Sequence, residues 1–507
     1  MNGGEGIKDL EVNGNKEKKC EVLMWGYLPG ASQLQSSLTS PVSVRFPEAE
    51  VSGDSWKDVC GGGCGFGLAI SASGKLITWG SADDQGQSYL TSGKHEETPE
   101  PYPLPTNDPI LKAAAGWAHC VSVTGKGEVY TWGWKECVPP GKVTCSWTSM
   151  KTFERNRSAK QSSTLTEQGS PQSQGPKPSV GSLSCSDDKN IEDESIKRRK
   201  VSTQEESEIS IPAEETLSAP PCLVMLDPLV KITSVAAGGR HTLALSDVGQ
   251  VWGWGYGGDG QLGLGNRVKT VASPHLIPCI DPSSCIKDKP DVVHQESESA
   301  AAQSHNSVGN YIRAVACGGR HSAVITDAGV LIAFGWGLYG QCGQGNREDL
   351  LRPTCVTSLS GTQIETVAAG LWHTICICKD GCVYAFGGNQ FGQLGLGTNS
   401  DQCELIPKLL DASVMENKNA KVVSCGARHS VILTGKMLYQ FGSDFGLPAT
   451  FRDEGKIYSW GWNKYGQLGL GDTVDRNIPS QVPVDNYVPK NIGCGWWHTL
   501  SLCETVS

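Results

Sequence analysis

The sequence lacks the features that mark several broad classes of protein. No apolar run approaches the about 18 residues that a membrane-spanning helix needs, which argues against a helical membrane protein. The residues after Met1 contain no apolar signal-peptide core, so we expect no secretory leader. Glycine is abundant, at 62 of 507 residues, yet it has no three-residue period, which excludes a collagen.

Charge and cysteine spacing further narrow the possible classes of protein and the cellular compartment. Charged residues make up only 19% of the chain and the net charge is −10, which argues against a protein that is basic all over and coats DNA. The 20 cysteines lack the spacing of a small disulfide-bonded domain, which favours a reducing cytosolic or nuclear compartment. A hydrophobic content of 38% is low for a wholly compact chain and predicts a folded part with polar, unfolded additions.

The chain is rich in tryptophan, and tryptophan recurs within a sequence repeat. The 15 tryptophans outnumber the 12 tyrosines and the 9 phenylalanines. Seven segments share a glycine cluster, then an anchor residue, and then an alternating strand. The anchor residues are Phe66, His119, His241, His321, His373, His429 and His498. An aromatic–Gly pair follows the first five anchors at constant spacing, as in Trp132-Gly133 and Trp254-Gly255.

The repeat predicts an all-β fold. Residues 242–252 read as two short alternating strands joined at a glycine turn. Four copies continue into a Gly-Gln-x-Gly-x-Gly segment, at residues 260–265, 340–345, 392–397 and 466–471. His321 and His373 are 52 residues apart, a period typical of a propeller rather than a helical solenoid. Seven anchors therefore predict a seven-bladed β-propeller with four-stranded blades.

The two ends of the chain predict how the ring closes. The last repeat stops before any aromatic–Gly strand, and residues 22–26 near the N-terminus supply that missing strand. We expect this strand to complete the last blade, which removes open sheet edges. Residues 22–507 are then the propeller and residues 1–21 a disordered N-terminus.

The repeat resembles that of the regulator of chromosome condensation family. The Gly-x-x-His strand, the Trp-Gly strand and the Gly-Gln-Leu-Gly-Leu-Gly turn recur in order over about residues 22–145 and 222–507. The resemblance implies a seven-bladed propeller. Members include a chromatin-bound nucleotide exchange factor for the Ran GTPase, a plant UV-B photoreceptor and many interaction platforms. The chain is most similar to the plant members, among them chromatin-associated proteins linked to cold tolerance.

A first insertion, at residues 146–221, is serine-rich and predicts a disordered surface loop. It contains four consecutive cations, Lys197, Arg198, Arg199 and Lys200, in an otherwise acidic stretch. Two interpretations remain open, a solvated charge run and a nuclear import signal. The second predicts a nuclear protein with some in the cytoplasm. Ser202 is a candidate phosphosite, and a phosphate there would offset the basic charge.

Two further insertions depart from the period. Residues 282–307 are polar and predict a second loop. Residues 435–452 interrupt the sixth blade, and deleting them restores a regular hairpin between Thr434 and Asp453. This segment is apolar for a loop tip, so an unspliced segment or gene-model error and a real loop both remain open.

No catalytic, cofactor or metal site emerges from the motifs. One histidine per blade is what a repeated structural hydrogen bond produces, whereas an active site needs one asymmetric constellation. Cys317, Cys425 and Cys494 stand where sister blades have alanine, so we assign them to the core. Cys376, Cys378 and Cys382 are the best metal candidate, yet four convergent ligands are not evident. The Gly-Gln segments lack a following helix and read as turns, not phosphate loops.

The residues just before the anchor histidines differ between blades and are therefore more informative. Loops at the strand starts converge on one face of a propeller, so we expect a ring of arginine and tryptophan there. The candidate partner-binding residues are Arg240, Arg320, Arg428, Trp117, Trp372, Trp496 and Trp497. Both residue types dominate interaction hot spots. The alternative is that the tryptophans fill space between blades and the arginines pair locally.

Three functions follow, in order of preference. The first is a non-enzymatic nuclear scaffold, a monomer that binds proteins such as nucleosomal histones, with direct DNA contact open and no membrane partner. The second is an exchange factor for a Ran-type small GTPase, which leaves no chemical motif. The third is a UV-B photoreceptor. That relative needs stacked tryptophans, and Gly239, Gly319 and Ala427 stand at matching positions here, so we expect no contiguous tryptophan cluster.

Overall fold

Alternating strands joined at glycine turns build every blade of the computed structural model. The structure describes residues 20–27, 37–47, 53–80, 98–117, 119–139, 218–278, 311–398, 402–416, 418–435 and 455–506. All of them belong to one compact unit, formed by Met1–Cys145 and Thr216–Ser507. No helix among these residues is long and apolar enough to cross a membrane.

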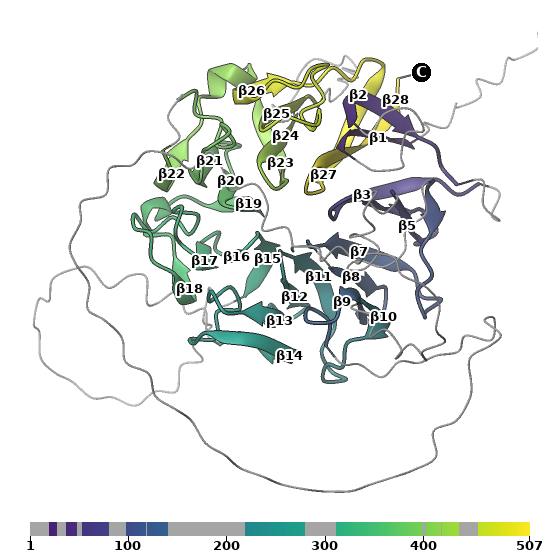
Figure 1. Ribbon diagram of the computed structural model, residues 1–507, viewed down its shortest axis with the longest axis vertical. Coiled ribbons are helices and arrows are strands. Elements are labelled where there is room, and N and C mark those ends of the chain that lie inside the picture. Colours follow the sequence, from purple (N-terminus) through teal and green to yellow (C-terminus); the bar gives the residue numbers. More distant parts are fainter. Residues whose placement is uncertain are drawn as a thin grey trace, which may run out of the picture. The chain divides into compact units, whose positions relative to one another are not determined.

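The described strands form seven antiparallel four-stranded sheets, the blades of a β-propeller (Figure 1). Blade one comprises β3 (Trp56–Gly62), β4 (Gly67–Ser71), β5 (Leu76–Trp79) and β6 (Glu100–Pro101). Blade two comprises β7 (Ile110–Ala115), β8 (His119–Thr124), β9 (Val129–Trp134) and β10 (Ser218–Leu223). Blade three comprises β11 (Ile232–Ala237), β12 (His241–Ser246), β13 (Val251–Gly257) and β14 (Val268–Leu276).

The next three blades repeat the pattern. Blade four comprises β15 (Ile312–Cys317), β16 (His321–Thr326), β17 (Leu331–Gly335) and β18 (Leu350–Cys355). Blade five comprises β19 (Ile364–Ala369), β20 (His373–Cys378), β21 (Val383–Gly387) and β22 (Glu404–Leu409). Blade six comprises β23 (Asn419–Cys425), β24 (His429–Gly435), β25 (Ile457–Gly461) and β26 (Arg476–Gln481). Two 3-10 helices, η2 (Thr357–Leu359) and η3 (Ala412–Met415), follow β18 and β22.

Both ends of the chain build blade seven. Its strand order is β2 (Ser37–Val44), β1 (Cys20–Tyr27), β28 (His498–Thr505) and β27 (Tyr487–Cys494). The purple N-terminal strands therefore lie beside the yellow C-terminal strands in Figure 1. Trp25 pairs with Thr499 and Gly26 with His498 across the closure. The prediction that N-terminal chain closes the ring is confirmed, and two strands close it rather than one.

The hydrophobic core lies between the blades. Seven clusters of buried side chains each join two neighbouring blades, as Phe66, Cys120 and Trp132 join blades one and two. The second strand of blades two to five is buried along its whole length. A strand that is covered on both faces needs apolar or hydrogen-bonded residues at every position, which explains why strict alternation is weak there.

Three predicted boundaries differ from the observed strands. Ser218 to Pro221, which we assigned to the first insertion, belong to β10. Cys20 and Glu21, assigned to the N-terminus, begin β1, and Gly435, assigned to the blade-six insertion, ends β24. The rest of these segments, together with residues 282–307, the basic cluster and Ser202, lies outside the described residues.

Candidate interaction face

The anchor histidines join each blade to the next. His241 Nε2 lies 2.9 Å from Ser322 Oγ, and His321 Nε2 lies 2.8 Å from Thr374 Oγ1. In each case the hydroxyl partner directly follows the anchor histidine of the next blade. The same bond joins His119 to Thr242, His373 to Ser430 and His429 to Thr499, at 2.8, 2.9 and 3.1 Å. All these histidines are fully buried.

The Gly-Gln turns complete this network and fix the direction of its hydrogen bonds. Thr374 Oγ1 donates to the carbonyl oxygen of Gln341 at 2.9 Å, so it accepts the Nε2–H of His321. The Gln341 side chain in turn accepts the backbone N–H of Tyr339. Ser322, Ser430 and Thr499 donate to the corresponding glutamines of blades three, five and six. The turns are thus occupied by interblade contacts, which supports our interpretation that they are not phosphate loops.

The anchor histidines stay neutral in the folded protein. Burial lowers the pKa of His321, His373 and His498 to about 3, and that of His119 to about 4. A Cβ on Gly370 would lie 2.1 Å from Cε1 of His373, so the ring fills the space that only glycine leaves. A neutral ring enclosed by its neighbours and repeated in six blades provides a scaffold, and its geometry gives no asymmetric reaction centre.

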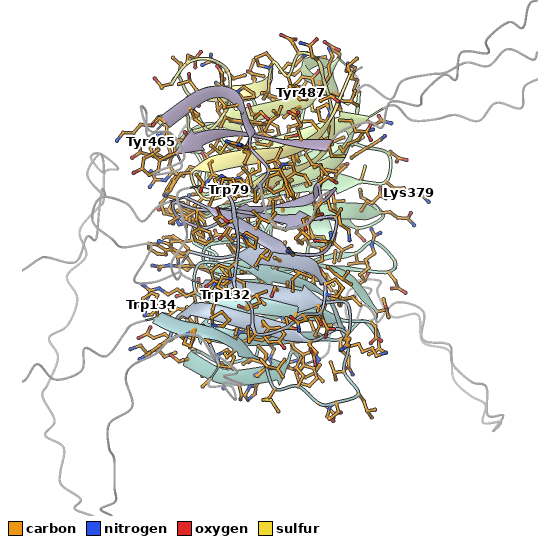
Figure 2. The ribbon with its side chains drawn as sticks, turned by 90° about the vertical axis from the view of Figure 1, so that its right-hand side faces the viewer. Trp79, Trp132, Trp134, Lys379, Tyr465 and Tyr487 are labelled. Atoms are coloured by element: carbon orange, nitrogen blue, oxygen red, sulfur yellow. The ribbon has the colours of Figure 1, made fainter. Side chains whose placement is uncertain are left out.

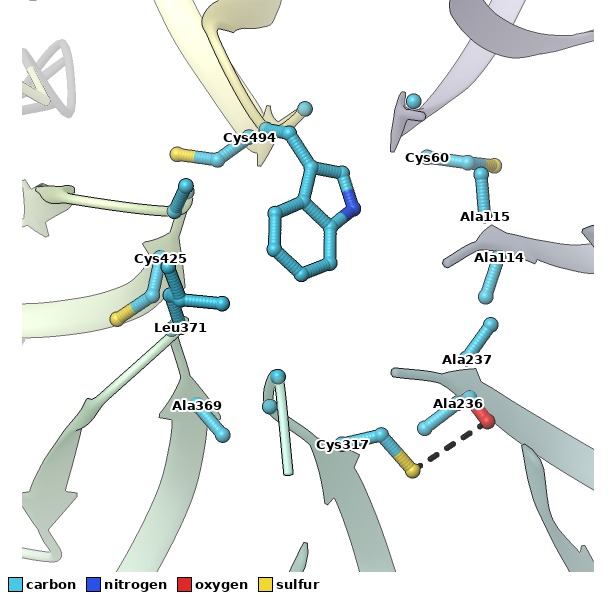
Figure 3. A pocket seen from close by; sticks show the side chains of 18 of the residues that line it. Cys60, Ala114, Ala115, Ala236, Ala237, Cys317, Ala369, Leu371, Cys425 and Cys494 are labelled. Carbon is cyan, nitrogen blue, oxygen red and sulfur yellow. Dashed lines mark hydrogen bonds between the residues drawn. The ribbon is translucent and has the colours of Figure 1, made fainter. Parts of the chain in front are cut away.

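The cysteines before the anchor glycines pack against the interblade core, as we assigned them, and also line the central channel. Cys317, Cys425 and Cys494, with Cys60, line a cavity of about 190 Å³ around the propeller axis. Figure 3 shows the four spaced around the channel, with Cys317 donating to the Ala236 carbonyl at 3.5 Å. Burial raises the pKa of Cys60, Cys317 and Cys494 to about 12. Among the described side chains, no group of three or more His, Cys, Asp or Glu could hold a metal ion.

The three candidate arginines lie over aromatic rings on the face where the second strands begin. Arg240 lies over Trp134 and Trp117, with 4.5 and 5.8 Å from Cζ to the ring centroids. Both rings belong to blade two, so Arg240 of blade three reaches across the blade boundary. Arg320 lies over Trp336 of its own blade at 5.0 Å. We call the surface built by these arginines and the surrounding rings the aromatic–arginine face.

Arg428 is the most enclosed of the three. Its Cζ lies 4.8 Å from the Phe391 ring, 5.2 Å from Trp462 and 5.4 Å from Trp372. These rings come from blades five and six, and each contributes a cation–π contact. The arginine is therefore oriented by three rings from two blades.

The remaining predicted tryptophans extend the same surface. Trp117 and Trp496 contact each other with ring centroids 6.1 Å apart, and Trp497 packs edge-on against Trp462 at 5.3 Å. Trp117 is 49% exposed. Trp372 stacks on Tyr339 at 5.0 Å. All seven predicted partner-binding residues thus lie in contact with an aromatic ring of this face.

The sequence pattern did not reveal most of the aromatic residues that build this face. Trp134, Trp336 and Trp462 each stand two residues after the buried aromatic of the third strand, and Tyr339 and Phe391 directly precede a Gly-Gln turn. The sequence signal that could have identified these tryptophans is Trp-Gly-Trp or Phe-Gly-Trp at the end of the third strand. Figure 2 shows Trp134 and Tyr465 at one side of the propeller, with Trp79 and Trp132 between the two sides and Lys379 at the other.

These residues build mixed aromatic groups on this face. Trp462 contacts Trp497 and Tyr465, and Tyr465 contacts Tyr27 at 5.0 Å. Trp336 contacts Tyr339, which stacks on Trp372. The third-strand exits thus supply rings that the anchor loops lack, and the tryptophans of this face contact one another as separate pairs, with tyrosines joining the other rings.

Comparison with known proteins identifies the repeat. The regulator of chromosome condensation (RCC1) repeat matches residues 248–290, 328–377, 380–433 and 454–502. A second form of that repeat matches residues 232–261, 312–341 and 364–393. Together these segments fall in blades three to seven.

Curated relatives share these repeats over about half of the chain. The chain is 35% identical to the ultraviolet-B receptor UVR8 of Arabidopsis thaliana over 277 residues, 54% of this chain and 51% of that protein. It is 32% identical to the human E3 ubiquitin-protein ligase HERC2 over 331 residues, 58% of this chain and 6% of that protein. The chain thus matches about half of the first relative and a small part of the second.

Solved structures share the fold along nearly the whole chain. Human WBSCR16 superposes with a TM-score of 0.62 and 17% identity, covering 96% of this chain and 100% of that one. Prp20p of Saccharomyces cerevisiae superposes with a TM-score of 0.61 and 17% identity, covering 97% and 93%. At this identity the likeness concerns the fold.

Proposed function

Because the chain belongs to the regulator of chromosome condensation repeat family, we propose that it is a non-enzymatic nuclear scaffold that binds chromatin or regulatory proteins through its aromatic–arginine face. The observation that carries this proposal is how the arginines are held. Arg240 and Arg320 form no ion pair among the described residues and lie over aromatic rings. By contrast, Arg267 pairs with Asp349 at 2.7 Å and Arg476 with Asp472 at 2.6 Å.

An arginine stacked on a ring keeps its N–H edge for another partner. The ring covers the face of the guanidinium, whereas the in-plane N–H groups match the two oxygens of a carboxylate. The surrounding tryptophans offer the large rigid contact area that interaction hot spots use. The face therefore fits a protein partner that presents carboxylates beside an apolar patch.

A nucleosome pull-down tests the proposal directly. The test variant carries Arg240→Glu, Arg320→Glu and Arg428→Glu. The matched control carries Lys126→Glu, Lys231→Glu and Lys379→Glu at the opposite ends of the blades, so both lose the same charge. We expect the arginine variant to lose about tenfold or more in binding, because charge reversal places like charges against the partner, and the lysine variant to bind as the parent does. Absence of binding by the parent protein, or equal losses in both variants, would contradict the proposal.

The second candidate is an exchange factor for a Ran-type GTPase. Prp20p of Saccharomyces cerevisiae is described with its binding properties to Gsp1p and histones, and the two propellers share a fold. An exchange factor acts by binding the nucleotide-free GTPase more tightly than the loaded form. Release of labelled GDP from Ran, with and without the chain, distinguishes the two functions, since a scaffold leaves the release rate unchanged.

UV-B reception is the third candidate, and the tryptophans of the aromatic–arginine face give a reason to test it. Gly239, Gly319 and Ala427 still stand where the receptor-type repeat carries tryptophan before arginine. We expect no change of elution volume on a sizing column after UV-B illumination. A shift of a dimer to a monomer would establish reception.

Nuclear import through Lys197, Arg198, Arg199 and Lys200 completes the proposal. A run of basic residues is what import receptors recognise. We expect a variant with all four changed to alanine to accumulate in the cytoplasm, as seen by fluorescence microscopy of a tagged chain. A variant that stays nuclear would show that another segment directs import.

A further inference from the structure

Blade five carries a pair of cysteines at the mouth of its central hairpin. Cys378 ends β20, and Cys382 directly precedes β21. The backbone N–H of Cys378 donates to the carbonyl oxygen of Cys382 at 2.9 Å, and the next pair inward is Ile377 with Val383. The two cysteines are therefore directly opposed in an antiparallel ladder, where side chains point to the same face.

The sister blades show where the first side chain of this pair points. The equivalent hydroxyl accepts the backbone N–H of the residue four positions later, at 3.2 Å from Thr124 to Glu128 and 3.0 Å from Ser246 to Gln250. In blade five, Cys378 takes the place of this serine or threonine. Its thiol lies near enough to Cys382 to raise the pKa of that thiol.

Accessibility differs between the two sulfurs. Cys382 is exposed, Cys378 is 5% exposed, and both are free thiols. Directly opposed residues in a hydrogen-bonded antiparallel pair have Cα atoms about 5.5 Å apart, inside the roughly 4.4–6.8 Å range of disulfides. An oxidant in solution therefore reaches the Cys382 sulfur first, and the buried Cys378 sulfur lies beside it.

We propose that Cys378 and Cys382 form a redox-active dithiol, which a peroxide closes into a disulfide across the hairpin. The Cys382 thiolate attacks one peroxide oxygen and the O–O bond breaks, which gives a sulfenic acid and releases the first water. The Cys378 sulfur then attacks the Cys382 sulfur, the S–O bond breaks and the second water leaves. The two thiols lose two electrons and two protons, and the peroxide gains them.

The environment of Cys382 affects the rate of this reaction. Burial, the neighbouring Cys378 and the charge of Asp380 raise the pKa of Cys382, which keeps the thiol protonated and slows its attack at neutral pH.

The hairpin lies on the opposite side of the propeller from the aromatic–arginine face, as Lys379 and Trp134 show in Figure 2. Closure of the disulfide therefore leaves the proposed binding face untouched.

Lys379, inside the hairpin, makes the test simple. Trypsin cleaves after Lys379 and separates the two cysteines into the peptides 348–379 and 380–408, which a Cys378–Cys382 disulfide keeps joined. These peptides also contain Cys355, Cys376 and Cys403, so fragment ions identify the two linked sulfurs. The full chain is treated with hydrogen peroxide, free thiols are alkylated, and the digest is analysed by mass spectrometry without reduction. We expect the linked pair to become the main form of these peptides and to disappear after reduction.

Variants decide between this disulfide and other oxidation products. Cys378→Thr restores the residue of the sister blades and should fold, and Cys382→Ser changes an exposed side chain. We expect neither to give the linked peptides, whereas Cys376→Ser should retain them. A parent chain that yields only sulfinic acid or unmodified Cys382, or a link that survives Cys378→Thr, would overturn the proposal.

Discussion

At the scale of single residues, the hydrogen bond between neighbouring blades requires a histidine and a hydroxyl. The chain lacks this bond at two junctions, for a different reason at each. Phe66 replaces the histidine of blade one and meets Cys120 in the next blade, so two apolar groups match. At the junction of blades seven and one, Gly67 follows the anchor position and has no hydroxyl to offer His498. Neither ring nitrogen of His498 bonds a side chain among the described residues, and the polar group beside the ring is the backbone of Gly61. This junction therefore lacks the hydroxyl bond of the other blades.

The missing hydroxyl bond predicts unequal effects of one substitution. His321→Phe removes the Nε2–H that Thr374 accepts and should lower the free energy of unfolding by about 2–3 kcal/mol. His498→Phe removes no such bond and should change that free energy by less than about 1 kcal/mol. Urea denaturation of both variants measures the difference. Equal losses would mean that ring volume alone matters.

A second pair of variants separates backbone strain from packing. Gly395 in the blade-five turn has φ +73°, and a Cβ there would lie 2.7 Å from Nε1 of Trp460. Gly361 has φ +85° and no atom within 4 Å. Gly361→Ala should cost about 1–2 kcal/mol for the left-handed backbone, and Gly395→Ala about 1–3 kcal/mol more for overpacking. Thermal unfolding of the two proteins tests this, and similar losses would show that Trp460 yields without cost.

The sequence predicted part of the aromatic–arginine face because Arg240 and Trp117 stand in loops that any propeller gathers on one face. It missed Trp134 and Trp462 because their position depends on strand register. The backbone N–H of Trp462 donates to the backbone carbonyl of Arg428. The end of the third strand of blade six therefore lies beside the loop that precedes the anchor histidine. The hydrophobic pattern shows that two strands pair, but not which residues stand opposite each other at their ends.

At the scale of elements, blade six shows that its hairpin tolerates a long interruption. Thr434 N–H donates to the Lys456 carbonyl at 2.9 Å, and Lys456 N–H donates to Thr434 Oγ1 at 3.3 Å. Thr124 and Glu128 of blade two make the same two bonds only four positions apart. Thr434 and Lys456 therefore close the blade-six hairpin as Thr124 and Glu128 close that of blade two.

Deleting residues 435–452 should leave a regular hairpin. The shorter loop loses less entropy on closure, so we expect the free energy of unfolding to rise by about 1–2 kcal/mol. Denaturant titration of the two proteins measures it, and transcript sequencing across the junction shows which form the cell makes. Loss of folding on deletion would show that the segment is a working part of blade six.

Edge strands explain the other differences between prediction and structure. The sequence predicted β1 from the Trp25-Gly26 pair, but β2 and the start of β10 carry no such signal. Both are outermost strands with mostly polar or half-exposed residues, and both contain proline. An outer strand packs on one side only, so its composition resembles that of a loop.

At the scale of the whole molecule, six buried neutral histidines predict acid lability. An unfolded histidine has a pKa of about 6.5, whereas burial lowers the pKa of His321 and His429 to about 3. The unfolded chain therefore takes up protons first, so stability present above pH 6.5 is lost as the pH falls toward 3. Each histidine contributes up to about 1.4 kcal/mol per pH unit in this window.

We expect the thermal midpoint to be level between pH 7 and 8 and to fall steeply between about pH 6.5 and 4.5. Carboxylates titrate mostly below about pH 4.5, so a decline that begins near pH 6.5 belongs to histidine. The His498→Phe variant, with one histidine fewer, should show a shallower slope. A midpoint that stays constant down to pH 5 would refute this account of the anchors.

Partners are proposed to bind the aromatic–arginine face, and crosslinking from single positions reports where they bind. A photo-crosslinking amino acid placed at Trp117 or Trp497 reports on this face, and one at Lys379 reports on the opposite ends of the blades. In nuclear extract, we predict that the first two positions give discrete adducts containing histones or a small GTPase, identified by mass spectrometry, and that position 379 gives none of them. Adducts formed mainly from position 379, or the same adducts from all three positions, would contradict the account.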